Sequence, residues 1–444
     1  MKHPYLPLTE SQRAEMLQQL NLTEFNDLLA EIPKEIFLKE PLNLPSPKTE
    51  PELINYFTTL AQKNNPLKLS FLGAGVYQHY IPTLVNHLAG RSEFYTAYTP
   101  YQPEISQGIL QAIYEYQSLI AELFGLSVAN ASLYDGPTAL AEAVIMATKE
   151  THLNRVLLPE SLNPNSLLVL KTYTKNLGLE LIPLPEKNGM VDYSALEKLL
   201  ETNTAAVVLQ NPNFYGIIED LPALIPLVKA AQAIPICYVH PLSLGLLESP
   251  GKLGAEIVVG EGQPLGLSPA YGGAYLGLMA TSERFLRRIP GRLVGETIDH
   301  QGGRAYVLTL QTREQHIRRE KATSNICSNE ALCALRAAIY LATLGPAGLE
   351  KVAKRAYNNA HYLQDNLANS GFPLLYQAPF FMEFAIKTTK PAVYYLEQLL
   401  PKGILAGHDL SKNLPNSDHA LLIAVTEVFS HAELDLFVQE MRCL

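Results

Sequence analysis

Tyr134 to Glu142 is the first segment whose residue types could do chemistry. The turn Asp135-Gly136-Pro137 leads into a helical pattern. The start of a helix presents free backbone N–H groups and a positive dipole end, which suit a phosphate. Thr138 could add a hydroxyl. An ordinary capped helix start explains the same residues, and Asp135 would repel an anion, so both interpretations stay open.

A second candidate segment runs from Phe94 to Gly108 and contains three tyrosines and two prolines. Side chains such as Tyr95 and Tyr98 combine an apolar body with a polar tip, which suits a pocket wall or an interface. Ordinary packing ahead of a helix that begins near Glu104 is the alternative.

The third candidate, Gln311 to Ile326, combines a cluster of Arg and Lys with the polar run Thr323-Ser324-Asn325. Guanidinium and ammonium groups hold carboxylates or phosphates, and hydroxyls before a helix could join them. A solvated charged helix with a capping turn is the alternative. The local positive charge in an acidic protein favours anion binding.

Single histidines and cysteines carry less information. His240 follows a short apolar strand, and a lone histidine there is usually structural. The four cysteines form no Cys-x-x-Cys pair, so we expect neither disulfides nor a metal site. We expect an exposed thiol at the C-terminal cysteine and burial of the other three; the cysteines are Cys237, Cys327, Cys333 and Cys443.

The elements that must position these residues follow an α/β pattern from about residue 70. Three short apolar runs, residues 205–209, 234–239 and 256–259, are typical of buried parallel strands. Helical segments between them predict a mostly parallel sheet.

The sequence predicts where two helices begin or end. The first is predicted from apolar residues at helical spacing, with Gly125 as its stop; these are Ile105, Ile109, Ile113, Ile120 and Phe124. The second is expected to begin after Ser328 as N-cap and to run to Leu344, where Gly345-Pro346 ends it.

Three parts are expected along the chain: a helical N-terminal arm (1–65), a large domain (66–345) and a smaller C-terminal α/β domain (346–444). In the arm, Thr9-Glu10 and Thr23-Glu24 can open helices. A run with four prolines should be extended; these are Pro41, Pro45, Pro47 and Pro51. Such an arm lacks a core of its own and would wrap the main body or a neighbouring subunit.

Composition limits the classes of function. The 444 residues are 47% hydrophobic and 17% charged, which indicates a globular protein. The net charge of -9 argues against a nucleic-acid surface. The first residues lack the apolar core of a signal peptide, and no apolar run approaches the roughly 20 residues of a membrane span. We therefore expect a cytoplasmic protein with no membrane contact.

Four segments together resemble the glycine decarboxylase P-protein of the glycine cleavage system, and within that family the alpha subunit (subunit 1) of its two-subunit bacterial form. They are residues 92–108, 211–216, 291–297 and 308–327. The resemblance covers essentially the whole chain. It implies the type I pyridoxal-phosphate-dependent transferase fold, with a large mostly parallel sheet.

The resemblance also marks an absence. Members that hold pyridoxal phosphate carry a His-Lys pair where this chain has Gln263-Pro264, ahead of a glycine-rich turn at residues 271–277. No lysine lies between Lys252 and Lys321. An acid normally found near His240 is missing too. The resemblance therefore implies that the beta subunit holds the cofactor covalently and that this chain binds none covalently.

The function implied is that of the alpha subunit of an α2β2 glycine dehydrogenase (decarboxylating). The complex releases CO2 from glycine and passes the aminomethyl group to the lipoyl arm of the H-protein. We expect no catalytic residue on this chain. Thr323, Ser324 and Asn325 would complete the cofactor phosphate site of the beta subunit, and Tyr95 and Tyr98 would line the glycine or lipoyl entrance.

Two other functions remain open from the sequence. A free-standing pyridoxal-phosphate enzyme would need another lysine, for which Lys321 is the candidate. A non-catalytic scaffold or regulator of the same fold is compatible with Pro264 and His240.

Overall fold

The computed structural model describes residue 5 and residues 8–38, 40–64, 66–270, 272–326, 328–414 and 417–444. Tyr271 of the glycine-rich turn and Cys327 lie outside the described residues. The chain separates into two compact units, Met1–Asn65 and Pro66–Leu444. A further division near residue 345 stays a prediction.

The first unit contains short helices without a core. Helix α1 (Glu10–Gln19) begins as expected, with Thr9 accepting a hydrogen bond from the Gln12 N–H. The second expected start opens only a 3-10 turn, Phe25–Leu29. Pro51 is not part of an extended run; it lies in the first turn of α2 (Glu50–Ala61), where proline needs no N–H partner. No residue of these three elements is buried.

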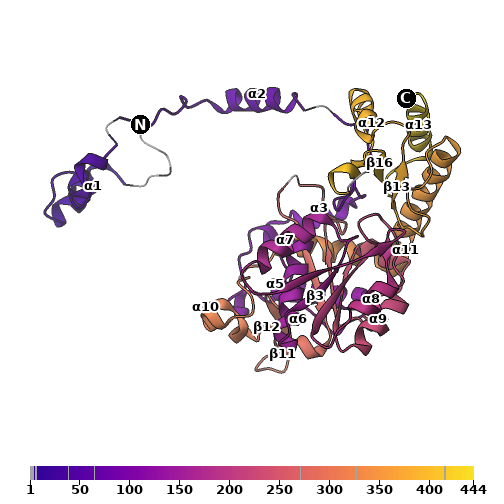
Figure 1. Cartoon of the computed structure of the whole chain (residues 1–444). Helices are drawn as coiled ribbons and strands as arrows, with labels where there is room; N and C mark the ends of the chain where they lie inside the picture. Colours follow the sequence, from indigo (N-terminus) through magenta and orange to yellow (C-terminus); the bar gives the residue numbers. More distant parts are fainter. Residues whose placement is uncertain are drawn as a thin grey trace. The chain divides into compact units, whose positions relative to one another are not determined.

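The second unit is built on a twisted sheet flanked by helices (Figure 1). Its seven strands lie in the order β2-β10-β9-β8-β7-β3-β4. Neighbours from β4 to β9 are parallel, while β10 runs antiparallel to β9 and β2. The predicted apolar runs form β7, β8 and β9, and the expectation of a mostly parallel sheet is confirmed. The strands are β2 (Val128–Ala129), β3 (Arg155–Pro159), β4 (Glu180–Leu184), β7 (Thr204–Asn211), β8 (Ile234–Val239), β9 (Ile257–Glu261) and β10 (Gly277–Thr281).

Helices cover both faces of this sheet. Val207 and Val208 are adjacent on β7 yet belong to different hydrophobic clusters, as alternation along a strand requires. One cluster includes residues of α5, α9 and α11, and the other includes residues of α6 and α7. These helices, with α8, are α5 (Gln107–Phe124), α6 (Gly136–Thr151), α7 (Pro164–Thr174), α8 (Tyr193–Leu199), α9 (Leu221–Ala230) and α11 (Ala331–Asn369).

The structure corrects the predicted start of α5. Its apolar residues Ile113 and Ile120 are buried, and Gly125 ends it at φ 70° as expected. Ile105 precedes the helix, in the 3-10 turn Pro103–Ile105, and is 81% exposed. Prolines 100 and 103 keep the preceding chain out of the helix.

Helix α11 also departs from its prediction. It begins at Ala331 with Glu330 as N-cap, since the Glu330 N–H donates to Ser132 Oγ instead of being capped by Ser328. The expected stop is confirmed, because Gly345 (φ 59°, ψ -178°) is not helical and a second helical stretch follows it across a kink. By length and composition α11 could cross a membrane, contrary to our expectation, yet one such helix is weak evidence. Residues including Ala337 and Tyr340 pack in the core beside the sheet.

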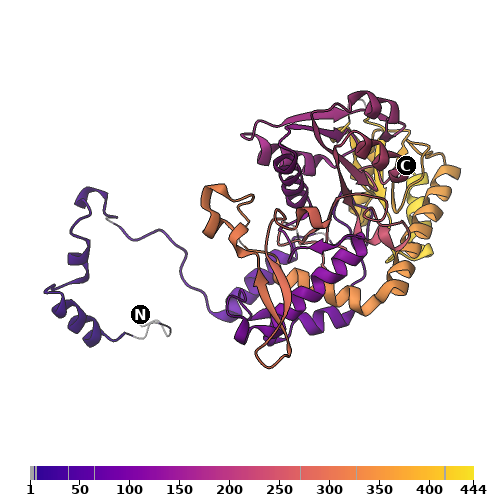
Figure 2. The ribbon, with the colours of Figure 1, turned by 90° about the horizontal axis from the view of Figure 1, so that it is seen from below.

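A smaller antiparallel sheet, β13-β16-β15, lies with α12 and α13 at the C-terminal end of this unit (Figure 1). The short β14 pairs with β1, which joins the start of the unit to its end. A hairpin, β11–β12, lies beside α5 (Figure 2). These elements are β1 (Leu69–Ser70), β11 (Leu293–Ile298), β12 (Arg304–Thr309), β13 (Glu383–Lys387), β14 (Ile404–Leu405), β15 (His408–Asp409), β16 (Ala420–Ala424), α12 (Ala392–Leu399) and α13 (His431–Arg442).

The remaining elements are short. They connect the larger helices and strands of the second unit: α3 (Thr83–Ala89), α4 (Ser92–Tyr95), β5 (Glu186–Lys187), β6 (Met190–Val191) and α10 (Gln315–Arg318).

Candidate functional site

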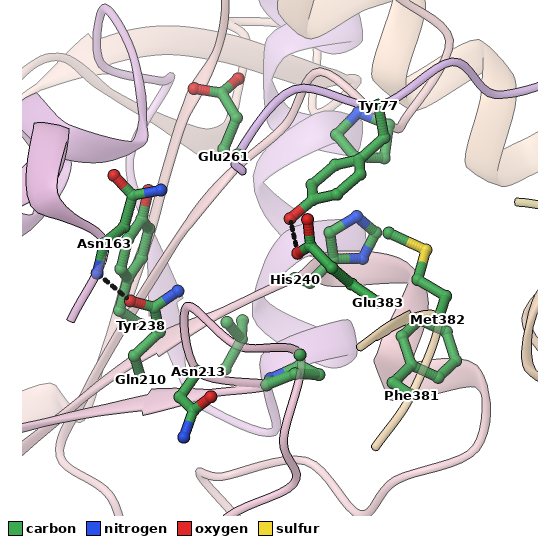
Figure 3. Close-up of a pocket in the computed structure, with 15 residues that line it drawn as sticks. Tyr77, Asn163, Gln210, Asn213, Tyr238, His240, Glu261, Phe381, Met382 and Glu383 are labelled. Atoms are coloured by element: carbon green, nitrogen blue, oxygen red, sulfur yellow. Dashed lines mark hydrogen bonds between the residues drawn. The ribbon is translucent and has the colours of Figure 1, made fainter. Parts of the chain in front are cut away.

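A cavity lies at the carboxyl ends of β7, β8 and β9 (Figure 3). Ligands of open parallel sheets bind at this edge. The cavity has a volume of about 50 Å³, room for a few water molecules. Its lining comes from these strand ends, from the loop after β1 and from the C-terminal part: Gly75, Tyr77, Asn163, Gln210, Pro212, Asn213, Gly216, Tyr238, Val239, His240, Glu261, Pro264, Phe381, Met382 and Glu383.

Gln263-Pro264 lies at this cavity, and neither residue offers an amine. Pro264 lines the wall. The Gln263 side-chain amide makes all of its hydrogen bonds to the backbone of Tyr77 and Leu267. Its Oε1 accepts the Tyr77 N–H at 3.1 Å, and its Nε2 donates to the carbonyls of Tyr77 (2.9 Å) and Leu267 (2.7 Å). This pair therefore supports structure and cannot bind an aldehyde covalently.

His240 follows β8 and packs its ring against aromatic neighbours in edge-on and tilted contacts. Its ring centroid lies 5.1 Å from that of Tyr77 and 6.1 Å from that of Phe381. Within the described part of the chain, neither ring nitrogen has a hydrogen-bond partner. Burial, and then the neighbouring His79, hold the pKa of His240 well below its usual range. A neutral imidazole cannot supply the negative charge that keeps a pyridine nitrogen protonated.

The start of α6 is already occupied by the chain's own carboxylates. The Gly136 N–H donates to Glu261 Oε2 at 2.8 Å, and the Thr138 N–H donates to Asp135 Oδ1 at 2.7 Å. Pro137 has no N–H, and the next N–H, that of Ala139, already donates to the Asp135 carbonyl within the helix. The capped-helix interpretation therefore describes this segment.

Glu261 is held firmly in that position. Its Oε1 also accepts the N–H groups of Gln263 (2.9 Å) and Leu276 (3.2 Å). A Cβ on Gly136 would lie only 2.9 Å from the Glu261 Cβ, so the helix start and β9 are in close contact. Burial raises the pKa of Glu261 to about 7, against the lowering effect of its three N–H donors. A phosphate would meet two carboxylates and no free N–H in this turn, so these residues do not fit pyridoxal phosphate.

Glu383 closes the opposite wall of the cavity (Figure 3). Its Oε2 accepts from the Tyr77 hydroxyl at 2.7 Å, and its Oε1 accepts from the Ala74 N–H at 2.7 Å. Burial raises the pKa of Glu383 to about 7. Sequence reasoning missed Tyr77, Asn163 and Glu383, because no motif links residues so far apart. Glu261 lies three residues before Pro264 in the sequence and could have been noticed as an acid beside a possible anion site.

Tyr95 and Tyr98 lie away from this cavity, on a separate groove. They are 58% and 85% exposed. The groove has a volume of about 250 Å³ and is also lined by Ser328 and Asn329, which follow shortly after Asn325. The structure therefore brings the two tyrosines together near the end of the third candidate segment.

Thr323 and Ser324 are partly buried against α6, while Asn325 is exposed. The Thr323 carbonyl accepts from Lys149 Nζ at 3.0 Å. Burial raises the pKa of Glu142 to about 7, against the lowering effect of the Ser324 hydroxyl. Their reach toward a partner stays a prediction.

The basic cluster of this segment does not bind an anion through its most buried member. Arg313 donates to the carbonyls of Ile289 and Gly291, a structural role. Lys321 is exposed and does not line the cavity.

The cysteines and the possible metal ligands do not indicate a further functional site among the described residues. Cys237 is buried, Cys333 is partly buried, so its expected full burial is wrong, and Cys443 is exposed as expected. Among the residues that the structure describes, no group of three His, Cys, Asp or Glu side chains could hold a metal ion.

Comparison with known proteins gives matches along the whole chain. A family model described as glycine cleavage system P-protein matches residues 3–441. A probable glycine dehydrogenase (decarboxylating) subunit 1 from Moorella thermoacetica is 51% identical over 439 residues, with 99% of each chain covered. The same-named protein of Anoxybacillus flavithermus is 47% identical with equal coverage.

Solved structures agree with these matches. A crystal structure of glycine decarboxylase (P-protein) of the glycine cleavage system, in inhibitor-bound form, is 42% identical and superposes with a TM-score of 0.91 over 99% of both chains. A sphingosine-1-phosphate lyase from Burkholderia pseudomallei shares the fold at 16% identity, with a TM-score of 0.66 over 93% of this chain and 92% of that one. The expected type I pyridoxal-phosphate-dependent transferase fold is confirmed.

Proposed function

Since this chain belongs to the glycine cleavage system P-protein family, we propose that it acts as subunit 1 of a glycine dehydrogenase (decarboxylating), an enzyme that requires a second subunit. Relatives that carry this name match 99% of the chain at 47 to 51% identity. Pyridoxal phosphate belongs to the working complex of this family. The complex takes glycine, releases CO2 and transfers the aminomethyl group to the lipoyl arm of the H-protein.

The second subunit holds the cofactor covalently in this proposal. The observation that carries it is the cavity at the strand ends, where Pro264 offers no amine and Glu261 occupies the helix start. This chain therefore contributes surface and positioning rather than the covalent step. We place the complex in the cytoplasm as an α2β2 assembly.

Two segments are the proposed contribution to the partner's site. Thr323, Ser324 and Asn325 complete the phosphate site of the partner's cofactor, and Tyr95 and Tyr98 line the entrance for glycine or the lipoyl arm. The exposure of both tyrosines, and the groove that they share with residues just beyond Asn325, support this arrangement.

Replacing Thr323 by Ala tests the phosphate contact. One hydrogen bond to a charged group contributes about 1.5–3 kcal/mol, so Thr323→Ala should weaken cofactor retention in the complex about tenfold or more. The exposed Thr202→Ala serves as the matched control. Cofactor release is followed by absorbance during dialysis of the complex; equal retention in Thr323→Ala and the control would contradict the role of Thr323.

A non-catalytic scaffold or regulator is the alternative function. The names of the relatives do not favour it. A free-standing enzyme that uses Lys321 is disfavoured because that side chain is exposed and does not line the cavity.

One experiment separates the three functions. The chain is purified alone and with the second subunit, pyridoxal phosphate is added, and absorbance and glycine-dependent CO2 exchange are measured. We expect activity only in the mixture. Cofactor colour on the isolated chain would support the Lys321 enzyme, and exchange by the second subunit at full rate without this chain would support the scaffold.

A further inference from the structure

Arg292 is a buried cation with no counterion among the residues that the structure describes. It is 4% exposed and directly precedes β11. Its guanidinium donates to two neutral oxygens, Thr99 Oγ1 at 3.3 Å and Tyr101 Oη at 3.2 Å, and lies 5.5 Å from the Tyr101 ring centroid. Its buried Nε has no hydrogen-bond partner within the described part of the chain.

No carboxylate compensates this charge. None of the ion pairs found among the described residues includes Arg292, and the residues outside that part include no Asp or Glu. An arginine stays protonated in proteins. Burying a charge without a partner is costly. In the isolated chain, the Arg292 charge therefore lacks the negative group that would balance it.

The guanidinium lines the groove of about 250 Å³ that also holds Tyr95 and Tyr98. Tyr116 of α5 lines the same groove, and its buried hydroxyl likewise lacks a partner among the described residues. Two unpaired donors in one largely apolar groove match the two oxygens of a carboxylate, the group that arginine binds best.

The surroundings indicate what carries that carboxylate. Large side chains that line the groove are exposed, namely Tyr95 (58%), Tyr98 (85%) and Leu332 (42%), and Tyr101, which accepts a hydrogen bond from Arg292, is 54% exposed. Exposed apolar side chains gathered at one groove are typical of a protein interface. A free small acid would neutralise Arg292 but would leave these side chains in water.

We propose that Arg292 and Tyr116 bind an acidic side chain of the partner subunit, inserted into this groove. The inference rests on the proposed function, which supplies the partner. It identifies the groove as a recognition surface, in which an aspartate or glutamate flanked by apolar residues pairs with the charge that this chain leaves unmatched.

The test compares Arg292→Met, Arg292→Lys and the exposed Arg287→Met. The dissociation constant of each variant for the second subunit is measured by sedimentation. Truncating one member of a buried charge pair weakens binding strongly, so we expect a rise in Kd of at least about 30-fold for Arg292→Met. Arg292→Lys should be intermediate, and Arg287→Met should match the wild type.

The isolated chain gives a second measurement. Removing an unpaired buried charge costs no stability when an apolar side chain of similar volume replaces it, so Arg292→Met alone should melt at or above the wild-type Tm. A lower Tm would indicate a structural role and would overturn the proposal.

The remaining outcomes are distinguishable. Failure of the wild-type chain to bind the second subunit would overturn the proposed function itself. Wild-type binding with an unchanged Kd for Arg292→Met would overturn this inference alone. If acetate raises the Tm of the wild-type chain but not of Arg292→Met, and leaves the wild-type Kd for the second subunit unchanged, the groove binds a free carboxylate and not a partner side chain.

Discussion

Glu261 lies three residues before Pro264 and places its carboxylate where a phosphate would accept hydrogen bonds from the start of α6. The missing lysine is therefore one of several changes at this site. Asp135 caps the same helix, and His240 stays neutral beside the cavity. The carboxylates of Glu261 and Asp135 take up the free N–H groups at the start of α6, so this turn needs no phosphate.

Restoring the amine alone should not restore cofactor binding. In Pro264→Lys, an amine faces the cavity, but Glu261 still occupies the helix start and repels phosphate. We expect no aldimine absorbance when pyridoxal phosphate is added to the isolated variant. The wild-type chain gives the baseline; absorbance above it that follows the cofactor concentration would show that the carboxylates do not exclude the phosphate.

Removing Glu261 should open the helix start to an external anion. Glu261→Ala leaves three N–H donors unpaired, and a buried unsatisfied donor costs about 1–3 kcal/mol. We expect a lower Tm that inorganic phosphate partly restores at constant ionic strength. The exposed Glu283→Ala should show neither effect. If phosphate leaves the Tm of Glu261→Ala unchanged, the Glu261 carboxylate does not take the place of a phosphate.

At the scale of elements, the sequence predicted what local pattern controls. The buried strands β7, β8 and β9 and the stop at Gly125 depend on apolar runs and on glycine at positive φ, which neighbouring residues encode. The start of α11 was wrong because Ser132, from a distant segment, takes the Glu330 N–H. The cavity could not be assembled from sequence for the same reason, since Tyr77 and Glu383 meet only in the folded chain.

The bend in α11 makes a test of local geometry possible. A Cβ on Gly345 would meet nothing within 4 Å, so the cost of Gly345→Ala comes from its φ of 59° alone. With ψ at -178°, this backbone conformation is one that only glycine adopts readily, and it costs another residue about 1–3 kcal/mol. Gly108→Ala is the matched control, since its Cβ is equally free and it lies within α5 at negative φ; alanine should stabilise that helix by about 0.5–1 kcal/mol. Urea unfolding measures the change in unfolding free energy for both variants. Equal changes would contradict a cost that comes from the backbone conformation of Gly345.

At the scale of the whole molecule, buried carboxyl groups with raised pKa values make the stability of the fold depend on pH. Burial raises the pKa of Glu142, Glu219 and Glu383 to about 7 each. A carboxyl whose pKa is higher in the folded state binds its proton more tightly there. Its contribution to stability is full below the unfolded pKa and is lost as pH rises through about 7.

The free energy of unfolding should therefore fall between pH 5 and pH 7.5. Each such group contributes a slope of at most about 1.4 kcal/mol per pH unit. Glu383→Gln should reduce the slope, and the exposed Glu283→Gln should not. Urea titrations across this range check the prediction; a stability that rises with pH would contradict it.

The first unit, Met1–Asn65, also lacks packing partners, as Arg292 lacks a counterion. Its helices bury no residue, although apolar side chains such as Phe57 and Ile54 are more than half exposed. A segment without a core cannot be stable by itself, which agrees with a chain that works as part of an assembly.

The central claim is that this chain belongs to a pyridoxal-phosphate enzyme whose cofactor another subunit holds. The most direct measurement is reduction of the active complex with borohydride, which fixes any Schiff base, followed by the intact mass of each chain. The account predicts the added mass of the cofactor on the second subunit and none on this chain. Cofactor mass on this chain would contradict it.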